Sequence, residues 1–156
     1  MGTHYQGDDR EVRALDAYSK LMRCVAMVGS NVQRSLSQEG LTPSQFGVLE
    51  SLFHLGPMCQ KAIGRKLLLS GGNITTVVRN LERRGLVSRT RDRKDRRFVT
   101  LALTPEGHAM IEGMFPSHAS TIARLMAQLE PEEQATLGAL CRKLGRGLED
   151  AASNGS

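Results

Sequence analysis

The sequence predicts a mainly α-helical fold that carries one small β-hairpin, and three observations support this prediction. Apolar residues recur every three to four positions over most of the chain, as on the buried side of a helix. Two β-prone runs, residues 86–91 and 98–103, flank a short polar stretch. Proline and glycine stand where the helices are expected to begin and end. A chain of 156 residues with 40% apolar composition matches one domain with its own hydrophobic core.

Two helices are predicted in the first third of the chain. The apolar stripe of the first extends over residues 10–37. The second has a complete start signal, with Thr42 as N-cap, Pro43 at the first helical position and Gln45 closing a capping box. Gly56, which is followed by a proline, is expected to end it.

A helix-turn-helix is predicted next. Residues 59–67 form its short first helix, and the second helix begins after Ser70 and ends before Gly85. The apolar stripe of the second helix consists of Ile74, Val77, Val78 and Leu81. Its opposite side is small and polar at first and basic further on, with Gly72, Thr75, Thr76, Arg79 and Arg83.

The hairpin that follows carries most of the excess positive charge. From Arg89 to Arg97 there are six basic and two acidic residues, a net charge of +4 in a chain whose total is +5. A charged run alone usually indicates a solvated surface. The order of helix, glycine, strand, basic turn and strand instead favours a winged helix-turn-helix, whose second helix enters the DNA major groove while the hairpin, or wing, reaches phosphates and the minor groove.

The last third is predicted to be helical. Thr104 caps a helix that Pro105 opens and that extends to about Gln128, and another helix begins at Pro131. Residues 150–156 are expected to form a loose tail. Long helices at both ends of the chain bury more apolar surface than one small core can cover, which predicts pairing with a second copy.

Residues 71–107, GGNITTVVRNLERRGLVSRTRDRKDRRFVTLALTPEG, resemble the core motif of the MarR family of bacterial transcription regulators. The specific part is the Asp-Arg-Arg of the wing followed by Leu-Thr-Pro-Glu-Gly, and the helix order is similar over residues 10–150. The resemblance implies one domain over residues 1–156, with a winged helix-turn-helix core at about 38–103. It also implies that the helices at about 10–37 and 104–150 interlock into a two-fold homodimer.

The expected partner is a near-palindromic double-stranded DNA operator, read by two recognition helices about one DNA turn (~34 Å) apart. By the family's Asp-x-Arg pattern, Arg97 is expected to enter the minor groove, oriented by Asp95. The full set of expected DNA-binding residues is Gln60, Lys61, Arg65, Ser70, Gly72, Asn73, Thr75, Thr76, Arg79, Asn80, Arg89, Arg91, Arg93, Lys94, Asp95, Arg96 and Arg97.

The resemblance further implies a repressor that a small aromatic or phenolic ligand releases from DNA. The candidate ligand-binding residues lie on the first two helices: Tyr18, Met22, Met27 and His54. One alternative is a thiol-based redox sensor using Cys24, although its position departs from that of the sensor cysteine in peroxide-sensing relatives, and a small buried apolar residue is the favoured interpretation. Another alternative is an effector-binding interaction protein that does not read DNA itself.

Several other classes are disfavoured. No convergent set of polar residues predicts a catalytic site, so we expect no enzyme and no cofactor. None of the four histidines is paired at i, i+4, and no metal site is expected. No apolar run is long enough to span a membrane, and the N-terminus has no signal-peptide core. Three cysteines without a paired motif favour a reducing bacterial cytoplasm, with the protein associated with the nucleoid.

Overall fold

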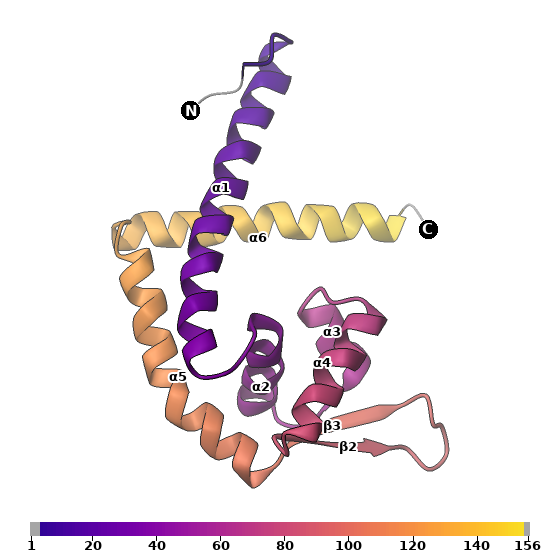
Figure 1. Ribbon diagram of the computed structural model, residues 1–156. Helices are drawn as coiled ribbons and strands as arrows, with labels where there is room; N and C mark the ends of the chain where they lie inside the picture. Colours follow the sequence, from indigo (N-terminus) through magenta and orange to yellow (C-terminus); the bar gives the residue numbers. More distant parts are fainter. Residues whose placement is uncertain (1–3, 155–156) are drawn as a thin grey trace. The chain divides into compact units, whose positions relative to one another are not determined.

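The computed structural model describes residues 4–154, which form a mainly helical fold with one small antiparallel sheet (Figure 1). The described residues divide into two compact units, with the boundary between Ala119 and Ser120. The elements in chain order are α1 (Asp9–Gln38), α2 (Pro43–Leu55), β1 (Met58–Cys59), α3 (Gln60–Lys66), α4 (Gly71–Arg83), β2 (Val87–Arg91), β3 (Val99–Leu103), α5 (Pro105–Met126) and α6 (Pro131–Asn154).

Helices α2 and α4 begin where their capping residues predict. At the start of α2 the Gln45 amide donates to Thr42 Oγ1 at 3.2 Å, and the Thr42 amide donates to Gln45 Oε1 at 3.0 Å, which completes the capping box. Ser70 Oγ accepts the Asn73 amide at 3.3 Å at the start of α4. These side chains satisfy backbone donors that the first helical turn leaves unpaired.

Two predictions about the elements were wrong. The strand β1 was not expected, because two residues are too short to show an alternating pattern; Met58 pairs with Leu101 of β3 and thereby makes the sheet three-stranded, in the order β1-β3-β2. The expected loose tail after residue 150 is helical as far as Asn154, since Ala151 and Ala152 are strong helix formers that continue α6.

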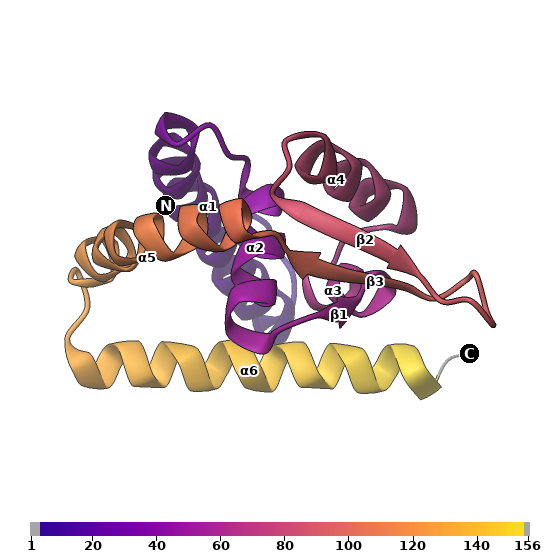
Figure 2. The same ribbon diagram turned by 90° about the horizontal axis from the view of Figure 1, so that it is seen from below.

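Helix α4 and the hairpin share the hydrophobic core of the first unit. Ile74, Val78 and Leu81 of α4 are buried, and so is Leu101 in the central strand. The remaining core residues are Leu36, Leu41, Phe46, Val48, Leu49, Leu52, Ile63, Leu86, Val87, Ile111 and Met114. Because one core holds both elements, their exposed sides keep a fixed relation to each other. In both views the loop between β2 and β3 projects beyond α3 and α4 (Figures 1 and 2).

The first turn of α5 is fixed against the chain just before β2. Thr104 Oγ1 donates to the Gly85 carbonyl at 2.6 Å and accepts the Gly107 amide at 3.0 Å. A Cβ at Gly107 would lie only 1.9 Å from the Leu86 carbonyl oxygen, so only glycine permits this approach. The base of the hairpin is therefore joined to α5 by a backbone contact that tolerates no side chain.

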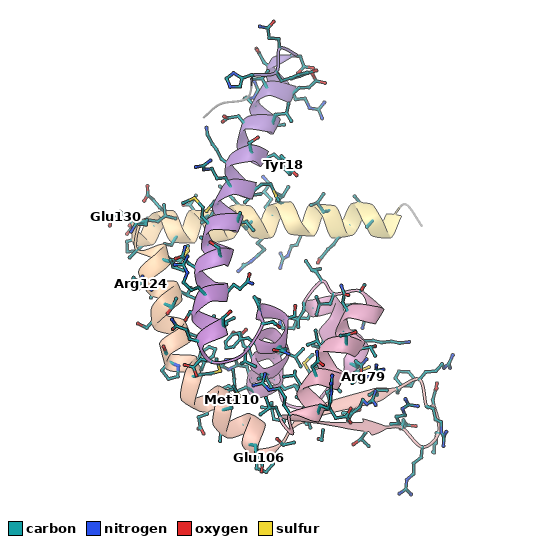
Figure 3. All side chains as sticks on the ribbon, viewed as in Figure 1. Tyr18, Arg79, Glu106, Met110, Arg124 and Glu130 are labelled. Atoms are coloured by element: carbon teal, nitrogen blue, oxygen red, sulfur yellow. The ribbon has the colours of Figure 1, made fainter. Side chains whose placement is uncertain are left out.

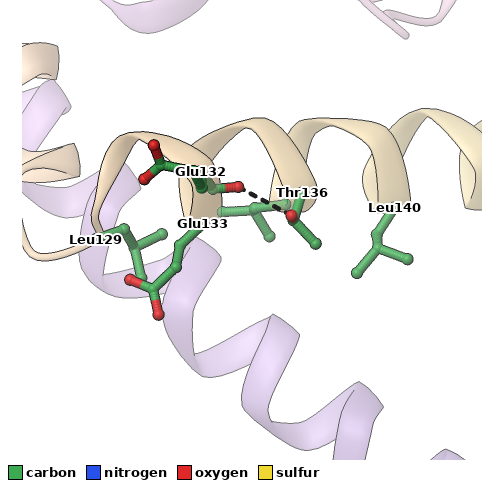
Figure 4. Close-up of a pocket in the computed structure, with 6 residues that line it drawn as sticks. Leu129, Glu132, Glu133, Thr136 and Leu140 are labelled. Atoms are coloured by element: carbon green, nitrogen blue, oxygen red, sulfur yellow. Dashed lines mark hydrogen bonds between the residues drawn. The ribbon is translucent and has the colours of Figure 1, made fainter.

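The second unit leaves an apolar side uncovered. Its α5–α6 turn is closed by Gln134, whose Nε2 donates to the carbonyls of Met126 and Leu129 at 3.2 and 3.0 Å. Along α6, Leu140, Leu144 and Leu148 are each between 55 and 65% exposed. Two shallow hollows of about 380 and 410 Å³ lie along this side, and Figure 4 shows the first of them, beside Thr136.

Candidate nucleic-acid interface

The exposed side of α4 carries the residues expected to read DNA. Because Ile74, Val78 and Leu81 are buried, the opposite side of the helix faces outward. Gly72, Asn73, Thr76 and Arg79 are all exposed there, and Arg79 is labelled in Figure 3. Asn80 is half-buried, and its Oδ1 accepts a hydrogen bond from Arg83 within the same helix. The outward side therefore offers small groups near its start and guanidinium groups further on.

Two of the expected DNA-binding residues lie between α3 and α4 instead of on the outer surface. Gln60 Nε2 donates to Thr75 Oγ1 at 3.2 Å, and Thr75 Oγ1 donates to the Gly71 carbonyl at 2.8 Å. Both side chains are half-buried beside a hollow of about 370 Å³, which Lys61 and Arg65 also line. Gln60 and Thr75 therefore hold the two helices together, while Lys61 and Arg65 are exposed cations.

The tip of the hairpin is a turn ordered by its own carboxylates. Asp92 Oδ1 accepts the amides of Lys94 and Asp95 at 2.7 and 2.9 Å. The Phe98 amide donates to the Asp95 carbonyl at 3.0 Å, and the Asp92 amide donates to the Phe98 carbonyl at 2.9 Å. A short polar side chain that bonds the backbone two and three residues on is a standard way to fix a turn. These bonds close the tip of the wing into a turn.

Asp95 also binds Arg97 through two parallel hydrogen bonds. Arg97 Nε donates to Asp95 Oδ1 at 3.0 Å and Nη2 donates to Oδ2 at 2.8 Å, while the Arg97 amide donates to Oδ1 at 3.0 Å. These bonds to Arg97 lower the pKa of Asp95, with a further lowering from the positive charge of Lys61. The bonds to Asp95 likewise raise the pKa of Arg97. The Arg97 side chain is nevertheless 83% exposed, so it is oriented without being covered.

The remaining basic residues of the wing fall into two groups. Arg89 is half-buried, and its Nε lies 3.5 Å from Glu82 Oε2 of α4, so this ion pair joins the base of the wing to that helix. The other four are exposed and form no ion pair within the described part of the chain: Arg91, Arg93, Lys94 and Arg96. Their uncompensated charge suits the phosphates of a nucleic acid.

Sequence reasoning missed a contact between the end of α4 and the corner between α1 and α2. Arg84 Nη1 donates to the Gly40 carbonyl at 2.8 Å, across 44 positions of sequence. Gly40 has a positive φ of 70°, which turns its carbonyl away from α1. An arginine just after a helix and a glycine just after another are common, so no pattern in the sequence singles out this pair.

Three of the candidate ligand-binding residues are exposed on α1, and the fourth lines a hollow beside α2. Tyr18, Met22 and Met27 are exposed on α1, with Tyr18 labelled in Figure 3. His54 instead lines a hollow of about 340 Å³ between α2 and α3, together with Glu50, Ser51, Leu55, Lys66 and Leu67.

The structure also brings together an aromatic cluster that the sequence did not reveal. The His54 ring centroid lies 5.0 Å from that of Phe53 and 4.7 Å from that of Phe115 of α5. His108 is edge-on to Phe53 at 5.1 Å, and His118 lies 4.2 Å from Phe46. Periodicity placed Phe46, Phe53 and His118 on apolar stripes of two helices, but it could not show that these helices bring their rings together.

The structure shows where the cysteines and the possible metal ligands lie. Cys24 is exposed, so the expectation that it is a small buried residue was wrong. Cys24, Cys59 and Cys141 are all free thiols. Over residues 4–154, no three histidine, cysteine or acidic side chains gather as metal ligands. Within the same residues, no helix is long and apolar enough to cross a membrane.

A helix-turn-helix, an adjoining antiparallel wing and a cationic surface over both define a winged helix-turn-helix DNA-binding protein. Comparison with known proteins gives the family. The MarR family model matches residues 41–99. The HTH-type transcriptional regulator YkoM of Bacillus subtilis, an uncharacterized protein, is 38% identical over 133 residues, which cover 85% of this chain and 86% of YkoM. This chain belongs to the MarR family, and it is a DNA-binding transcription regulator, not an enzyme.

Two solved structures show the fold in functional contexts. The MepR–DNA complex of Staphylococcus aureus matches with a TM-score of 0.73 and 26% identity, covering 83% of this chain and 97% of MepR. BpsR of Bordetella bronchiseptica, whose DNA binding is regulated by 6-hydroxynicotinic acid, matches with a TM-score of 0.77 and 26% identity, covering 83% of this chain and 98% of BpsR. The fold described above is thus one that binds DNA in MepR and responds to a small ligand in BpsR.

Proposed function

We propose that this chain is a homodimeric repressor that binds a near-palindromic DNA operator and is released from it by a small aromatic acid. The observation that carries the proposal is the shared core of α4 and the wing, which presents the exposed Arg79 and the oriented Arg97 from one rigid body. Two such bodies, related by a two-fold axis, would contact half-sites about one DNA turn apart. Such a protein acts in the bacterial cytoplasm, at the nucleoid.

The proposed contacts divide by chemistry. Gly72, Asn73, Thr76 and Arg79 face base edges in the major groove, where asparagine suits adenine and arginine suits guanine. Arg97 enters a minor groove, whose negative potential is greatest where A·T pairs narrow it. The phosphate contacts are assigned to Lys61, Arg65, Ser70, Arg91, Arg93, Lys94 and Arg96. Gln60, Thr75, Asn80, Arg89 and Asp95 position these groups from within the protein.

Exposed apolar stripes on the first and last helices support the homodimer. Leu140, Leu144 and Leu148 lie on one side of α6, and no residue of α6 whose exposure is described is buried. Tyr18, Met22 and Val25 are likewise exposed on α1. Apolar surface of this extent favours association, because covering it removes it from water. A second copy supplies two further stripes of the same kind.

The aromatic cluster and the regulation of BpsR support an aromatic effector. Phe53 and Phe115 offer ring faces and edges, and His54 lies between that cluster and a hollow that also contains Lys66. An aromatic acid would gain stacking from the rings and charge attraction from the cation. Tyr18, Met22 and Met27 on α1 remain predicted contributors, since flexible methionines adapt to varied ligands.

A thiol switch is the second candidate, because Cys24 is exposed on α1. An exposed thiol can be oxidised without prior unfolding. Oxidation of Cys24 would act on α1, the same helix that the aromatic ligand is proposed to contact. The two mechanisms therefore differ in the chemical signal but share this helix.

The test is DNA protection upstream of the protein's own gene, repeated with salicylate-like acids, other phenolic acids and a thiol oxidant. We expect a protected near-palindrome, loss of protection with an aromatic acid, and a higher melting temperature of the free protein with that acid. A ligand that binds the DNA-free conformation ~100-fold more tightly than the DNA-bound one shifts the equilibrium between the two conformations by about 2.7 kcal/mol. If only the oxidant acts, and Cys24→Ser abolishes its effect, the thiol mechanism replaces the ligand. A compact protein that protects no DNA would contradict the proposal.

A further inference from the structure

Two consecutive glycines at the start of α4 are not required by the fold. A Cβ added to Gly71 or to Gly72 would meet no atom within 4 Å, and neither residue has a positive φ. Glycine is also among the poorest helix formers. The protein's own packing and backbone therefore offer no reason for glycine at these two positions, in contrast to Gly107, where a side chain cannot fit.

Thr76, one turn after Gly72 on the outward side of α4, has no free hydrogen-bond donor. Its Oγ1 donates to the Gly72 carbonyl at 3.1 Å, and Thr75 Oγ1 bonds to the Gly71 carbonyl in the same way. A hydroxyl carries a single proton, so neither threonine has one left for a base. What each retains on its surface is a methyl group.

Only one of these two methyl groups lies on the outward side of the helix. Thr75 is half-buried and faces α3, where Gln60 bonds to its hydroxyl. Thr76 is exposed, lies four residues after Gly72, and therefore shares its side of the helix. On this side of α4, the open space left by Gly72 therefore lies next to the methyl group of Thr76. Arg79 follows within the next turn of the helix.

We infer that Gly72 and Thr76 determine operator specificity by accepting the 5-methyl group of a thymine in each half-site. This rests on the proposed DNA-binding function and adds the chemistry of the base that is read. The thymine methyl is the one apolar group that base pairs display in the major groove. Thr76 contacts it with its own methyl group, and the absence of a Cβ at Gly72 leaves room for it.

The experiment uses an operator selected from a pool of random duplexes by the full-length protein. Each thymine is replaced in turn by deoxyuridine, which lacks only the methyl group and keeps every hydrogen bond of the base pair. We expect one thymine per half-site whose replacement weakens binding by about fourfold, the equivalent of one buried methyl-sized group. Replacements elsewhere in the half-site should change affinity little.

Matched variants assign the effect to residues. Thr76→Ser keeps the hydroxyl bonded to Gly72 and loses the methyl group, so it should bind the thymine and deoxyuridine operators equally, at the weaker level. Thr75→Ser makes the same change on the side facing α3 and should keep the full preference for thymine. Gly72→Ala should leave the melting temperature unchanged or raise it by up to about 3 °C, yet weaken operator binding.

Three results would overturn the inference. These are tight, sequence-specific binding with no sensitivity to any thymine methyl, a Thr76→Ser protein that keeps the thymine preference, and a Gly72→Ala protein that loses affinity for operator and random DNA equally. The last would mean that glycine serves approach to the phosphate backbone. In each case sequence-specific binding persists, so the proposed function stands. If the proposed DNA-binding function itself were wrong, the protein would select no sequence from the pool, so the two failures can be told apart.

Discussion

Asp95 accepts both Nε and Nη2 of Arg97, at 3.0 and 2.8 Å, while Arg97 remains 83% exposed at the tip of the wing. An arginine held in one orientation before binding loses less side-chain entropy when it meets DNA. The pair thus gives the wing a preformed cationic probe, and the turn built on Asp92 holds the pair in place.

The first prediction concerns the charge of this probe. Arg97→Ala should weaken operator binding and flatten the slope of log affinity against log salt by roughly 0.9 for each lost contact. Arg96→Ala is the matched control, since Arg96 is an exposed neighbour whose loss should change the slope but not the preference for A·T pairs in the minor groove. Fluorescence anisotropy over a series of salt concentrations measures both effects. Unchanged affinity and slope for Arg97→Ala would remove Arg97 from the interface.

The second prediction follows from the lowered pKa of Asp95, whose ordinary value is 3.8. A carboxylate whose pKa is lower in the folded state stabilises the wing above the ordinary value and loses that effect as pH falls through the lowered one. The Asp95–Arg97 pair should therefore persist from neutral pH down to below pH 3.8, provided the core stays folded. Titration of the Asp95 carboxyl carbon by NMR measures this directly. In Arg97→Ala the same carbon should titrate closer to 3.8, and an identical titration in both proteins would contradict the contact.

The third prediction concerns base reading by Arg79. Arg79→Ala removes a guanidinium that can bond guanine through two atoms, a contact that typically contributes ~1–3 kcal/mol of discrimination. Binding to the operator should weaken more than binding to random DNA, and the preference at one base pair per half-site should relax. Competition between operator and random duplexes reports the ratio. An equal loss on both duplexes would show that Arg79 contacts only phosphate.

The fourth prediction compares two glycines of α5. Gly107→Ala places a Cβ 1.9 Å from the Leu86 carbonyl oxygen and should destabilise the protein by about 1–3 kcal/mol or more. Gly113→Ala meets no atom within 4 Å and should leave stability unchanged or raise it by ~0.8–1.0 kcal/mol. Urea unfolding of both variants gives the two values. Equal stability of the two proteins would mean that α5 does not pack against the hairpin as described.

The fifth prediction concerns the apolar side of α6. Leu144→Glu places a charge in the middle of the exposed leucines, and it should convert a dimer to a monomer because burying an unpaired carboxylate is unfavourable. Arg142→Gln makes the same change of −1 in net charge at an exposed position two residues earlier, on the other side of the helix, and serves as the control. Sedimentation velocity distinguishes the two states. A Leu144→Glu protein that sediments as the wild type does would exclude this side of α6 from the interface.

Local signals predicted most of the elements. The capping box of Thr42 and Gln45, the cap at Ser70 and the glycine after α4 each depend on residues close in sequence, and the structure contains all three. The hairpin followed from its alternating pattern and its charged centre. The strand β1 did not, because Met58 becomes a strand residue only through its pairing with Leu101 of β3.

The sequence predicted on which side of a helix the site residues lie, but it did not predict which residues they contact. Periodicity placed both Thr75 and Thr76 away from the core, and only the structure shows that Thr75 turns toward Gln60 of α3. The contact between Arg84 and Gly40 depends on how α4 packs against the α1–α2 corner, which no local pattern encodes. The aromatic cluster of α2 and α5 was missed for the same reason.

The most direct test of the account is selection of double-stranded DNA from a random pool by the full-length protein at physiological salt. We predict enrichment of one near-palindromic sequence whose half-sites are centred about one helical turn apart, ~34 Å, with a thymine in each half-site and an A·T-rich flank. A folded protein that enriches no sequence, or that binds all duplexes alike and only through salt-sensitive charge, would contradict it.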